Sequence, residues 1–121
     1  MVAPQIGVGQ RDVWWADLGD PIGSVAGFIR PVIIVQNDAI NVSRLATYLC
    51  IPLTSNLRWK ELPWNLFLSA AATGLDKDSV AQTGLMFAVD RNQLTEQAGR
   101  ITARQIAQLF HCLDIALGRA A

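Results

Sequence analysis

The segment GFIRPVIIVQND, residues 27–38, combines one arginine, one proline and an uninterrupted apolar run. Its part PVIIVQ, residues 31–36, is short and rich in β-branched residues, which is typical of a strand buried on both faces. Arg30 stands directly before this strand. Because an unpaired buried charge is costly and a strand core does not need an arginine, Arg30 is a candidate functional residue.

Short strand patterns recur on both sides of this segment, and turn signals rich in Gly, Pro, Asn and Asp separate them. Pro52 predicts an edge or a bulge for the third of these strands. The segment 19–27 holds three glycines and one proline and is predicted to be a mobile loop. The predicted strands are 13–18, 31–36, 47–54, 65–70, 79–81 and 85–90.

The C-terminal part of the chain has helical periodicity instead. Thr102 is a plausible N-cap, and Gly118 suits the end of the helix. The apolar residues at helical spacing are Ile106, Leu109, Phe110, Leu113 and Leu117. Short strands followed by one amphipathic helix predict a mainly β (α+β) fold, in which a small bent sheet or barrel is closed by a C-terminal helix.

The composition fits one domain over residues 1–121, since the chain has 51% hydrophobic and 17% charged residues. This apolar surplus indicates a surface covered by a second copy or by another protein. Ten basic residues balance ten acidic ones, so the net charge does not announce a nucleic-acid-binding protein. Between residues 28 and 60 there are four basic residues and one acidic residue. A solvated surface explains this pattern as well as a nucleic-acid-binding surface does.

Several classes of site are excluded by counts and spacing. His111 is the only histidine, and no CxxC or HxxxH spacing occurs, so we expect no metal site and no two-histidine ribonuclease mechanism. No glycine-rich phosphate loop precedes a helix, and no cofactor is expected. Cys50 and Cys112 are too few for a disulfide scaffold. With neither a signal-peptide pattern nor an 18-residue apolar stretch, we expect a cytoplasmic protein without membrane contact.

Polar residues gather where the predicted strands begin and end. Arg30 precedes one strand, Gln36-Asn37-Asp38 follows it, and Thr54-Ser55-Asn56 ends another. If the two strands pair, Arg30 and the Thr54 hydroxyl converge on one edge, which is a phosphate-binding arrangement. The alternative, left open by spacing alone, is an arginine paired with a carboxylate beside an ordinary turn.

Five blocks of the sequence resemble the MazF/PemK family of bacterial toxin endoribonucleases, in the order and spacing of that family. The blocks are RDVWWADLGDPIGS (11–24), RPVIIVQNDAIN (30–41), IPLTSN (51–56), KDSV (77–80) and VDRNQLTEQAGRI (89–101). The resemblance implies an SH3-like barrel of the CcdB/MazF type with a C-terminal helix, usually as a homodimer. It also implies metal-independent cleavage of single-stranded RNA and inhibition by a cognate, MazE-like antitoxin.

The resemblance further implies that Arg30 and Thr54 are catalytic and that the loop 19–29 covers the site. In RNA the 2′-OH can attack the adjacent phosphate, so the protein must align the reacting groups and stabilise charge. The pKa of arginine, above about 12, makes it a poor general base, so the base stays unassigned. The residues expected to contact RNA are Ser24, Phe28, Gln36, Asn37, Ser55, Asn56, Arg58, Lys60 and Phe87.

The sequence departs from the family pattern near this surface. Val25 stands where an acid is usual, and Phe28 stands where glycine is usual. Leu85 and Phe87 replace a glutamine and a basic residue. The departures allow three interpretations: an unusual RNA motif read by stacking on aromatic rings, a more apolar antitoxin groove, or a weakened nuclease.

Two further questions stay open from the sequence. Trp59 and Trp64, in the segment RWKELPW, suit a nucleic-acid groove and equally suit a satellite cluster under a loop. The alternative function is a protein of the same fold that only binds an antitoxin or a gyrase-like target. A gyrase poison would carry a C-terminal Trp-Gly-Ile, whereas this chain ends ALGRAA.

Overall fold

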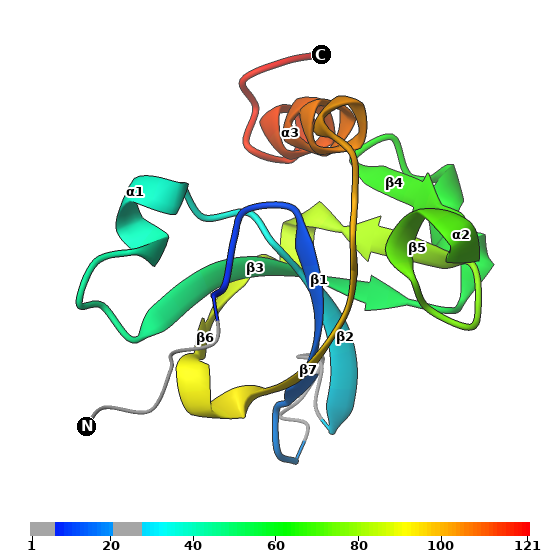
Figure 1. Ribbon diagram of the computed structural model, residues 1–121. Helices are drawn as coiled ribbons and strands as arrows, with labels where there is room; N and C mark the ends of the chain where they lie inside the picture. The colour runs from blue at the N-terminus through cyan, green and yellow to red at the C-terminus, as the bar shows by residue number, and fades with distance from the viewer. Residues whose placement is uncertain (1–6, 21–27) are drawn as a thin grey trace, which may run out of the picture.

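The computed structural model describes residues 7–20 and 28–121, which form a bent antiparallel sheet with one long helix across it (Figure 1). The sheet has seven strands in this described part of the chain. They are β1 (Asp12–Asp17), β2 (Ile29–Ile34), β3 (Thr47–Thr54), β4 (Asn65–Leu68), β5 (Ser79–Gln82), β6 (Phe87–Asp90) and β7 (Leu94–Arg100).

The long helix is α3 (Ala103–Ala116), and the predicted start is confirmed. The Thr102 hydroxyl accepts a hydrogen bond from the Gln105 backbone N–H at 3.1 Å, which completes half of a capping box. The short elements are α1 (Asp38–Asn41), α2 (Ala70–Thr73) and the 3₁₀ turns η1 (Leu57–Glu61), η2 (Thr83–Leu85) and η3 (Arg91–Gln93). No helix among the described residues combines the length and apolar character needed to cross a bilayer.

The central strand β3 pairs with three neighbours. It pairs with β2 on one side, and with β6 and then β5 along the other. Pro52 is therefore on a central strand, so of the predicted edge or bulge the edge is wrong. It lies between the segment that pairs with β6 and the segment that pairs with β5. The missing N–H of proline does least harm at this break between two ladders.

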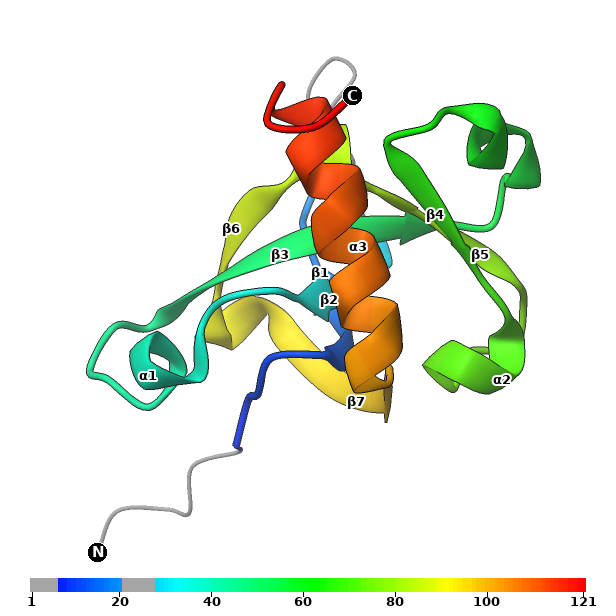
Figure 2. The same ribbon diagram turned by 90° about the horizontal axis from the view of Figure 1, so that it is seen from above.

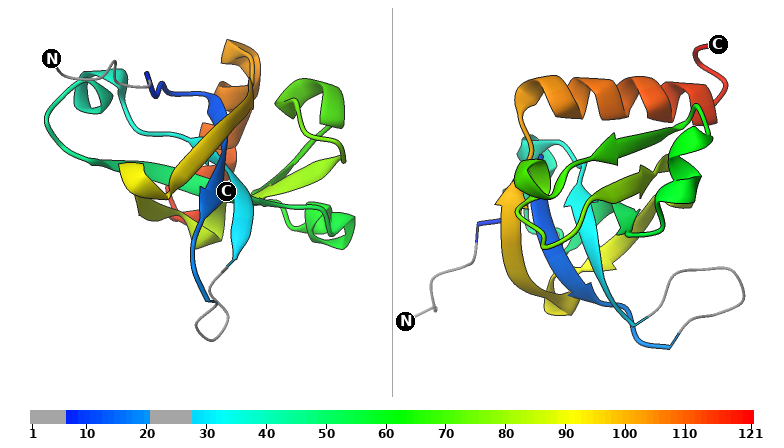
Figure 3. Two further views of the ribbon diagram at one scale, coloured as in Figure 1. Left: turned by 60° about the horizontal axis from the view of Figure 1, so that its bottom comes forward. Right: turned by 90° about the vertical axis from the view of Figure 1, so that its right-hand side faces the viewer.

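The strand β7 was not predicted, because its sequence LTEQAGR is polar and lacks alternation. Its pairing with β1 holds it in the sheet, with two register shifts along the ladder. The strand order β4-β5-β3-β2-β1-β7, with β6 on β3, does not return to its start within the described residues. The expected barrel is thus a strongly curled sheet that hydrogen bonding does not close (Figure 3).

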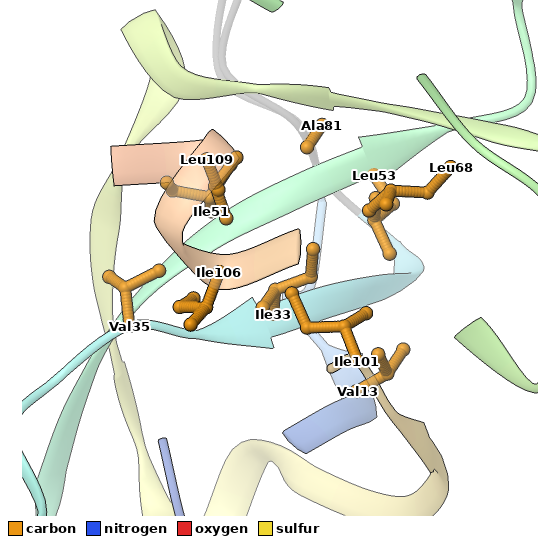
Figure 4. Packing of buried hydrophobic residues seen from close by; sticks show 10 residues of the cluster. All are labelled: Val13, Ile33, Val35, Ile51, Leu53, Leu68, Ala81, Ile101, Ile106 and Leu109. Atoms are coloured by element: carbon orange, nitrogen blue, oxygen red, sulfur yellow. The ribbon is translucent and has the colours of Figure 1, made fainter. Parts of the chain in front are cut away.

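Each face of the sheet carries a hydrophobic core. One face packs under α3, which lies across β1 to β3 (Figures 2 and 4). The other face lines the inside of the curl, where Trp14, Tyr48 and Val89 meet. On β2, Ile33 joins the first core, whereas Val32 and Ile34 join the second, as expected from the alternation of side chains along a strand. The predicted two-sided burial of this strand is confirmed.

The backbone of α2 lies directly on β7 through two glycines. A Cβ added to Gly99 would be 2.4 Å from the Thr73 carbonyl oxygen, and one added to Gly74 would be 2.2 Å from the Ala98 carbonyl oxygen. Gly74 also ends α2 with a φ of 82°. This contact is possible only because neither Gly74 nor Gly99 has a side chain.

We expect Gly99→Ala to lower the free energy of unfolding by about 1–3 kcal/mol, because the new methyl group overlaps backbone atoms that cannot rotate away. Urea denaturation followed by circular dichroism measures the loss. The control is Gly7→Ala, since a Cβ there meets nothing within 4 Å. Equal stability of the two variants would contradict the close backbone contact.

Candidate functional site

Arg30 and Thr54 lie on neighbouring strands in the same row. In the antiparallel register of β2 and β3, Val32 is opposite Pro52 and Ile33 is opposite Ile51. Continuing this register by two residues places Arg30 opposite Thr54. The two residues line one surface cavity of about 180 Å³. The other residues that line it are Pro52, Leu53, Trp59, Gln82 and Leu85.

The chemistry of this cavity suits an anion. Arg30 is exposed at the start of β2, and the lining contributed by residues 7–20 and 28–121 contains no acidic side chain. The Thr54 hydroxyl oxygen accepts a hydrogen bond from the Asn56 backbone N–H at 3.2 Å. Because this bond uses an oxygen lone pair, the hydroxyl keeps its own hydrogen for donation. A guanidinium and a hydroxyl donor therefore face the same space.

A second cavity, of about 260 Å³, also borders Arg30. Arg30 and Leu53 line both cavities. The second cavity brings in Lys77 from the KDSV block and Asp76, so its lining holds two basic side chains and one acidic side chain. The remaining residues around it are Trp15, Ile29, Pro31, Ser55 and Leu75.

The turn η1 follows Thr54 and forms one wall of the site. Asn56 accepts a hydrogen bond from the Arg58 backbone N–H, which starts the turn. The Arg58 guanidinium lies 5.1 Å from the centre of the Trp59 ring, and the Lys60 ammonium lies 5.9 Å from the centre of the Phe67 ring. The sequence left Trp59 open between a nucleic-acid groove and a satellite cluster, and it gave no signal for Gln82. The interleaving of basic and aromatic residues in RWK was the available signal for Trp59.

Gln36 and Asn37 are not brought together with Arg30. They follow the opposite end of β2, beside α1, which lies on the side of the sheet away from β4 and β5 (Figure 1). Gln36 donates hydrogen bonds to the Asn41 side-chain oxygen and the Thr47 carbonyl, both at 2.9 Å, and accepts one from the Leu49 backbone N–H. Asn37 caps α1. These amides hold the fold at a distance from Arg30, and their expected contact with RNA stays a prediction.

Asp38 belongs to the same structural network. Its carboxylate accepts hydrogen bonds from the Gln10 backbone N–H at 2.8 Å and from the Asn41 side chain at 3.1 Å. These two bonds lower the pKa of Asp38, and the nearby charges of Arg100 and Arg11 act in the same direction. The carboxylate thereby ties the N-terminal segment to α1.

The two aromatic replacements have structural roles. Phe28 adopts a φ of 60°, in the left-handed region that favours glycine, and its side chain is 59% exposed. It closes the β1–β2 connection by hydrogen bonds with Leu18 and Gly19. Phe87 is opposite Cys50 and packs partly against the second core. Ser24 and Val25 lie outside the described residues.

Neither cysteine offers a thiolate for catalysis. Both are free and buried. Burial raises the pKa of Cys50 to about 12 and also raises the pKa of Cys112. Within residues 7–20 and 28–121, no group of three or more His, Cys, Asp or Glu side chains is arranged around a metal position.

Comparison with known proteins adds the decisive observation. Residues 9–117 match the family described as PemK-like, MazF-like toxin of type II toxin-antitoxin system. The chain belongs to this family. It is 37% identical to the endoribonuclease MazF6 of Mycobacterium tuberculosis over 112 residues, which cover 93% of this chain and 95% of that protein. It is 29% identical to the endoribonuclease EndoA of Bacillus subtilis over 111 residues, covering 91% and 94%.

Solved structures of PemK-like and MazF-like toxins share the fold. MazF from Deinococcus radiodurans superposes with a TM-score of 0.78 at 21% identity, covering 94% of this chain and 99% of that one. A mycobacterial endoribonuclease solved in complex with its cognate antitoxin gives a TM-score of 0.72 at 19% identity, covering 94% and 96%. The expected sheet with a C-terminal helix is therefore the fold of the family.

We expect Phe28→Gly to raise the free energy of unfolding by about 0.5–1 kcal/mol. Relief of roughly 1–2 kcal/mol of left-handed strain exceeds the roughly 0.5–1 kcal/mol of extra chain entropy that glycine brings to the unfolded state. Thermal denaturation measures the change. The control Phe28→Ala removes the same exposed ring but keeps the strain, so a gain in that variant too would contradict the explanation.

We expect the stability supplied by Asp38 to be lost only in acid. Because folding lowers its pKa, the contribution is complete above the ordinary aspartate value of about 3.9 and disappears as pH falls through the lower folded value. Wild type should thus lose more stability than Asp38→Asn between about pH 4 and pH 2 in urea titrations. Glu96→Gln, at an exposed position on β7, is the control and should follow wild type.

Proposed function

We propose that this chain is the toxin of a toxin–antitoxin pair and acts as an endoribonuclease on single-stranded RNA without a metal ion. The observation that carries the proposal is the convergence of Arg30 and Thr54 on one cavity. The relatives named endoribonucleases match most of the chain, which supports the same activity here. Inside the bacterial cytoplasm, messenger RNA is the accessible single-stranded substrate.

The proposed reaction uses the nucleophile of the RNA itself. The 2′-oxygen forms a bond to the adjacent phosphorus, and the bond from phosphorus to the 5′-oxygen breaks. The products are a 2′,3′-cyclic phosphate and a free 5′-OH. The proton of the 2′-OH leaves, and the 5′-oxygen gains a proton. A single-stranded DNA lacks the 2′-OH and would bind without being cut.

The protein contributes charge stabilisation and alignment. Arg30 can direct two N–H donors of its guanidinium at a phosphate, where negative charge grows in the transition state. The Thr54 hydroxyl donates to a non-bridging phosphate oxygen. Since a guanidinium offers N–H donors and no acceptor, Arg30 acts as a donor and not as the general base.

We also propose a homodimer and inhibition by a MazE-like antitoxin. Exposed apolar side chains gather around α1 and the start of β3, where Val42 is 84% exposed and Leu45 is 58% exposed. A patch of this kind on a small protein is typical of a surface that a partner covers. Structures of related toxins with their antitoxins support such a partner.

A binding-only protein is the second candidate function. The observation in its favour is the apolar character of Phe28, Leu85 and Phe87, where the family pattern has glycine, glutamine and a basic residue. A protein that captures an antitoxin or a gyrase-like target would keep the fold and would not need Arg30 with Thr54.

We expect wild type to cut a long mixed-sequence RNA, in EDTA, into discrete fragments with 5′-OH ends. Arg30→Ala and Thr54→Ala should each lower the rate by at least about 100-fold, the usual effect of removing one donor to the transition-state charge. Arg104→Ala, on the exposed face of α3, is the control and should cut normally. Gel mapping of end-labelled RNA measures the rates.

Two outcomes would contradict the proposal. Full activity in both site variants would remove Arg30 and Thr54 from catalysis. No cleavage by folded wild type, on RNA of several compositions, would favour the binding-only protein.

A further inference from the structure

We propose that Arg58, Trp59, Lys60 and Phe67 form a track on which the unpaired bases next to the cleaved phosphate stack. We call these four residues the aromatic track. The inference rests on the proposed function, because it assumes RNA at Arg30, and it identifies the surface that receives the neighbouring nucleotides.

The sheet register aligns the track with the catalytic pair. Thr54 is opposite Val80 on β5, and Val80 is opposite Phe67 on β4. Thr54, Val80 and Phe67 therefore form one row across three strands, and Arg30 lines the same cavity as Thr54. Two strand spacings of about 4.8 Å put Thr54 and Phe67 about 10 Å apart.

Phe67 points away from the core under α3. Its neighbours Leu66 and Leu68 on β4 pack with that core, so alternation directs Phe67 to the face that Thr54 occupies. The turn η1 packs against β4 and β5. Trp59 of this turn lines the Arg30–Thr54 cavity, and Lys60 reaches the Phe67 ring. The two rings therefore continue the catalytic cavity towards the edge of the sheet.

The rings and cations suit single-stranded nucleic acid. Trp59 is 37% exposed and Phe67 is 42% exposed, although large aromatic residues usually bury their rings. A cation lies near each ring, at 5.1 Å and 5.9 Å from the ring centres. An occupant must offer flat apolar faces together with negative charge. Unpaired bases on a phosphate backbone offer both, and a duplex hides the faces by stacking.

The test uses binding of a fluorescently labelled, mixed-sequence single-stranded DNA, which the proposed reaction cannot cut. Trp59→Leu and Phe67→Leu keep an apolar side chain but remove the ring. Each should weaken binding by about 5- to 150-fold, the usual effect of losing one base–aromatic stack. The matched controls Trp59→Phe and Phe67→Tyr keep a ring and should bind within a few-fold of wild type.

Salt dependence separates stacking from charge. Arg58→Gln and Lys60→Gln should each reduce the slope of log K against log salt by about 0.7, as expected when one phosphate contact to a single strand is lost. The leucine variants should leave this slope unchanged. Arg104→Gln on α3 is the matched control for a lost surface cation, and its slope should equal that of wild type.

Fluorescence gives a second signal that folding defects would not imitate. Stacking of a base on Trp59 should quench tryptophan emission in wild type, and most of this quenching should be absent in Trp59→Phe although that variant still binds. Affinity that is unchanged in both leucine variants, with each variant folded by circular dichroism, would overturn the proposal and leave the surface to a protein partner.

The outcomes also distinguish this inference from the proposed function. If wild type binds in a way that depends on the rings but cuts no RNA, the aromatic track is supported and the proposed nuclease activity is contradicted. If cleavage depends on Arg30 but is unchanged when either ring is removed, the proposed nuclease activity is supported and the aromatic track is contradicted.

Discussion

The antiparallel register between β2 and β3 is the constraint on which the rest of the structure depends. In the second half of β2, Ile33 enters the core under α3, and Val32 and Ile34 enter the core inside the curl. A slip of one residue would exchange the two sets and expel Ile33 from its core. Burial on both faces therefore fixes the register, and the register in turn places Arg30 opposite Thr54. Apolar packing thus sets the geometry of a polar site.

The two ends of β2 use polar side chains in different ways. After its C-terminal end, Gln36 donates a hydrogen bond to the Thr47 carbonyl and accepts one from the Leu49 backbone N–H, and Asp38 accepts one from the Gln10 backbone N–H. These bonds join the end of β2 to β3 and to the N-terminal segment. At its N-terminal end, Arg30 borders two cavities. Residues that look equivalent in the sequence, as polar groups at strand ends, therefore differ in place: some hold the fold, and Arg30 faces open surface cavities.

The departures from the family pattern also divide by environment. Phe28 has a left-handed backbone conformation and an exposed ring, and Phe87 packs partly against the second core. Leu85, in contrast, lines the Arg30–Thr54 cavity directly, together with Trp59. Of these three departures, only Leu85 gives an apolar side chain to the cavity of Arg30 and Thr54.

The sequence by itself determined the strand pattern, the C-terminal helix with its Thr102 cap, and the candidates Arg30 and Thr54, because periodicity, capping and block order are local signals. Only the tertiary structure decided where Pro52, β7 and Gln36 lie in the sheet. It also placed Trp59 and Gln82 around the Arg30–Thr54 cavity. These depend on which strands become neighbours. Contacts between distant segments follow from packing of the whole sheet, and no single segment encodes them.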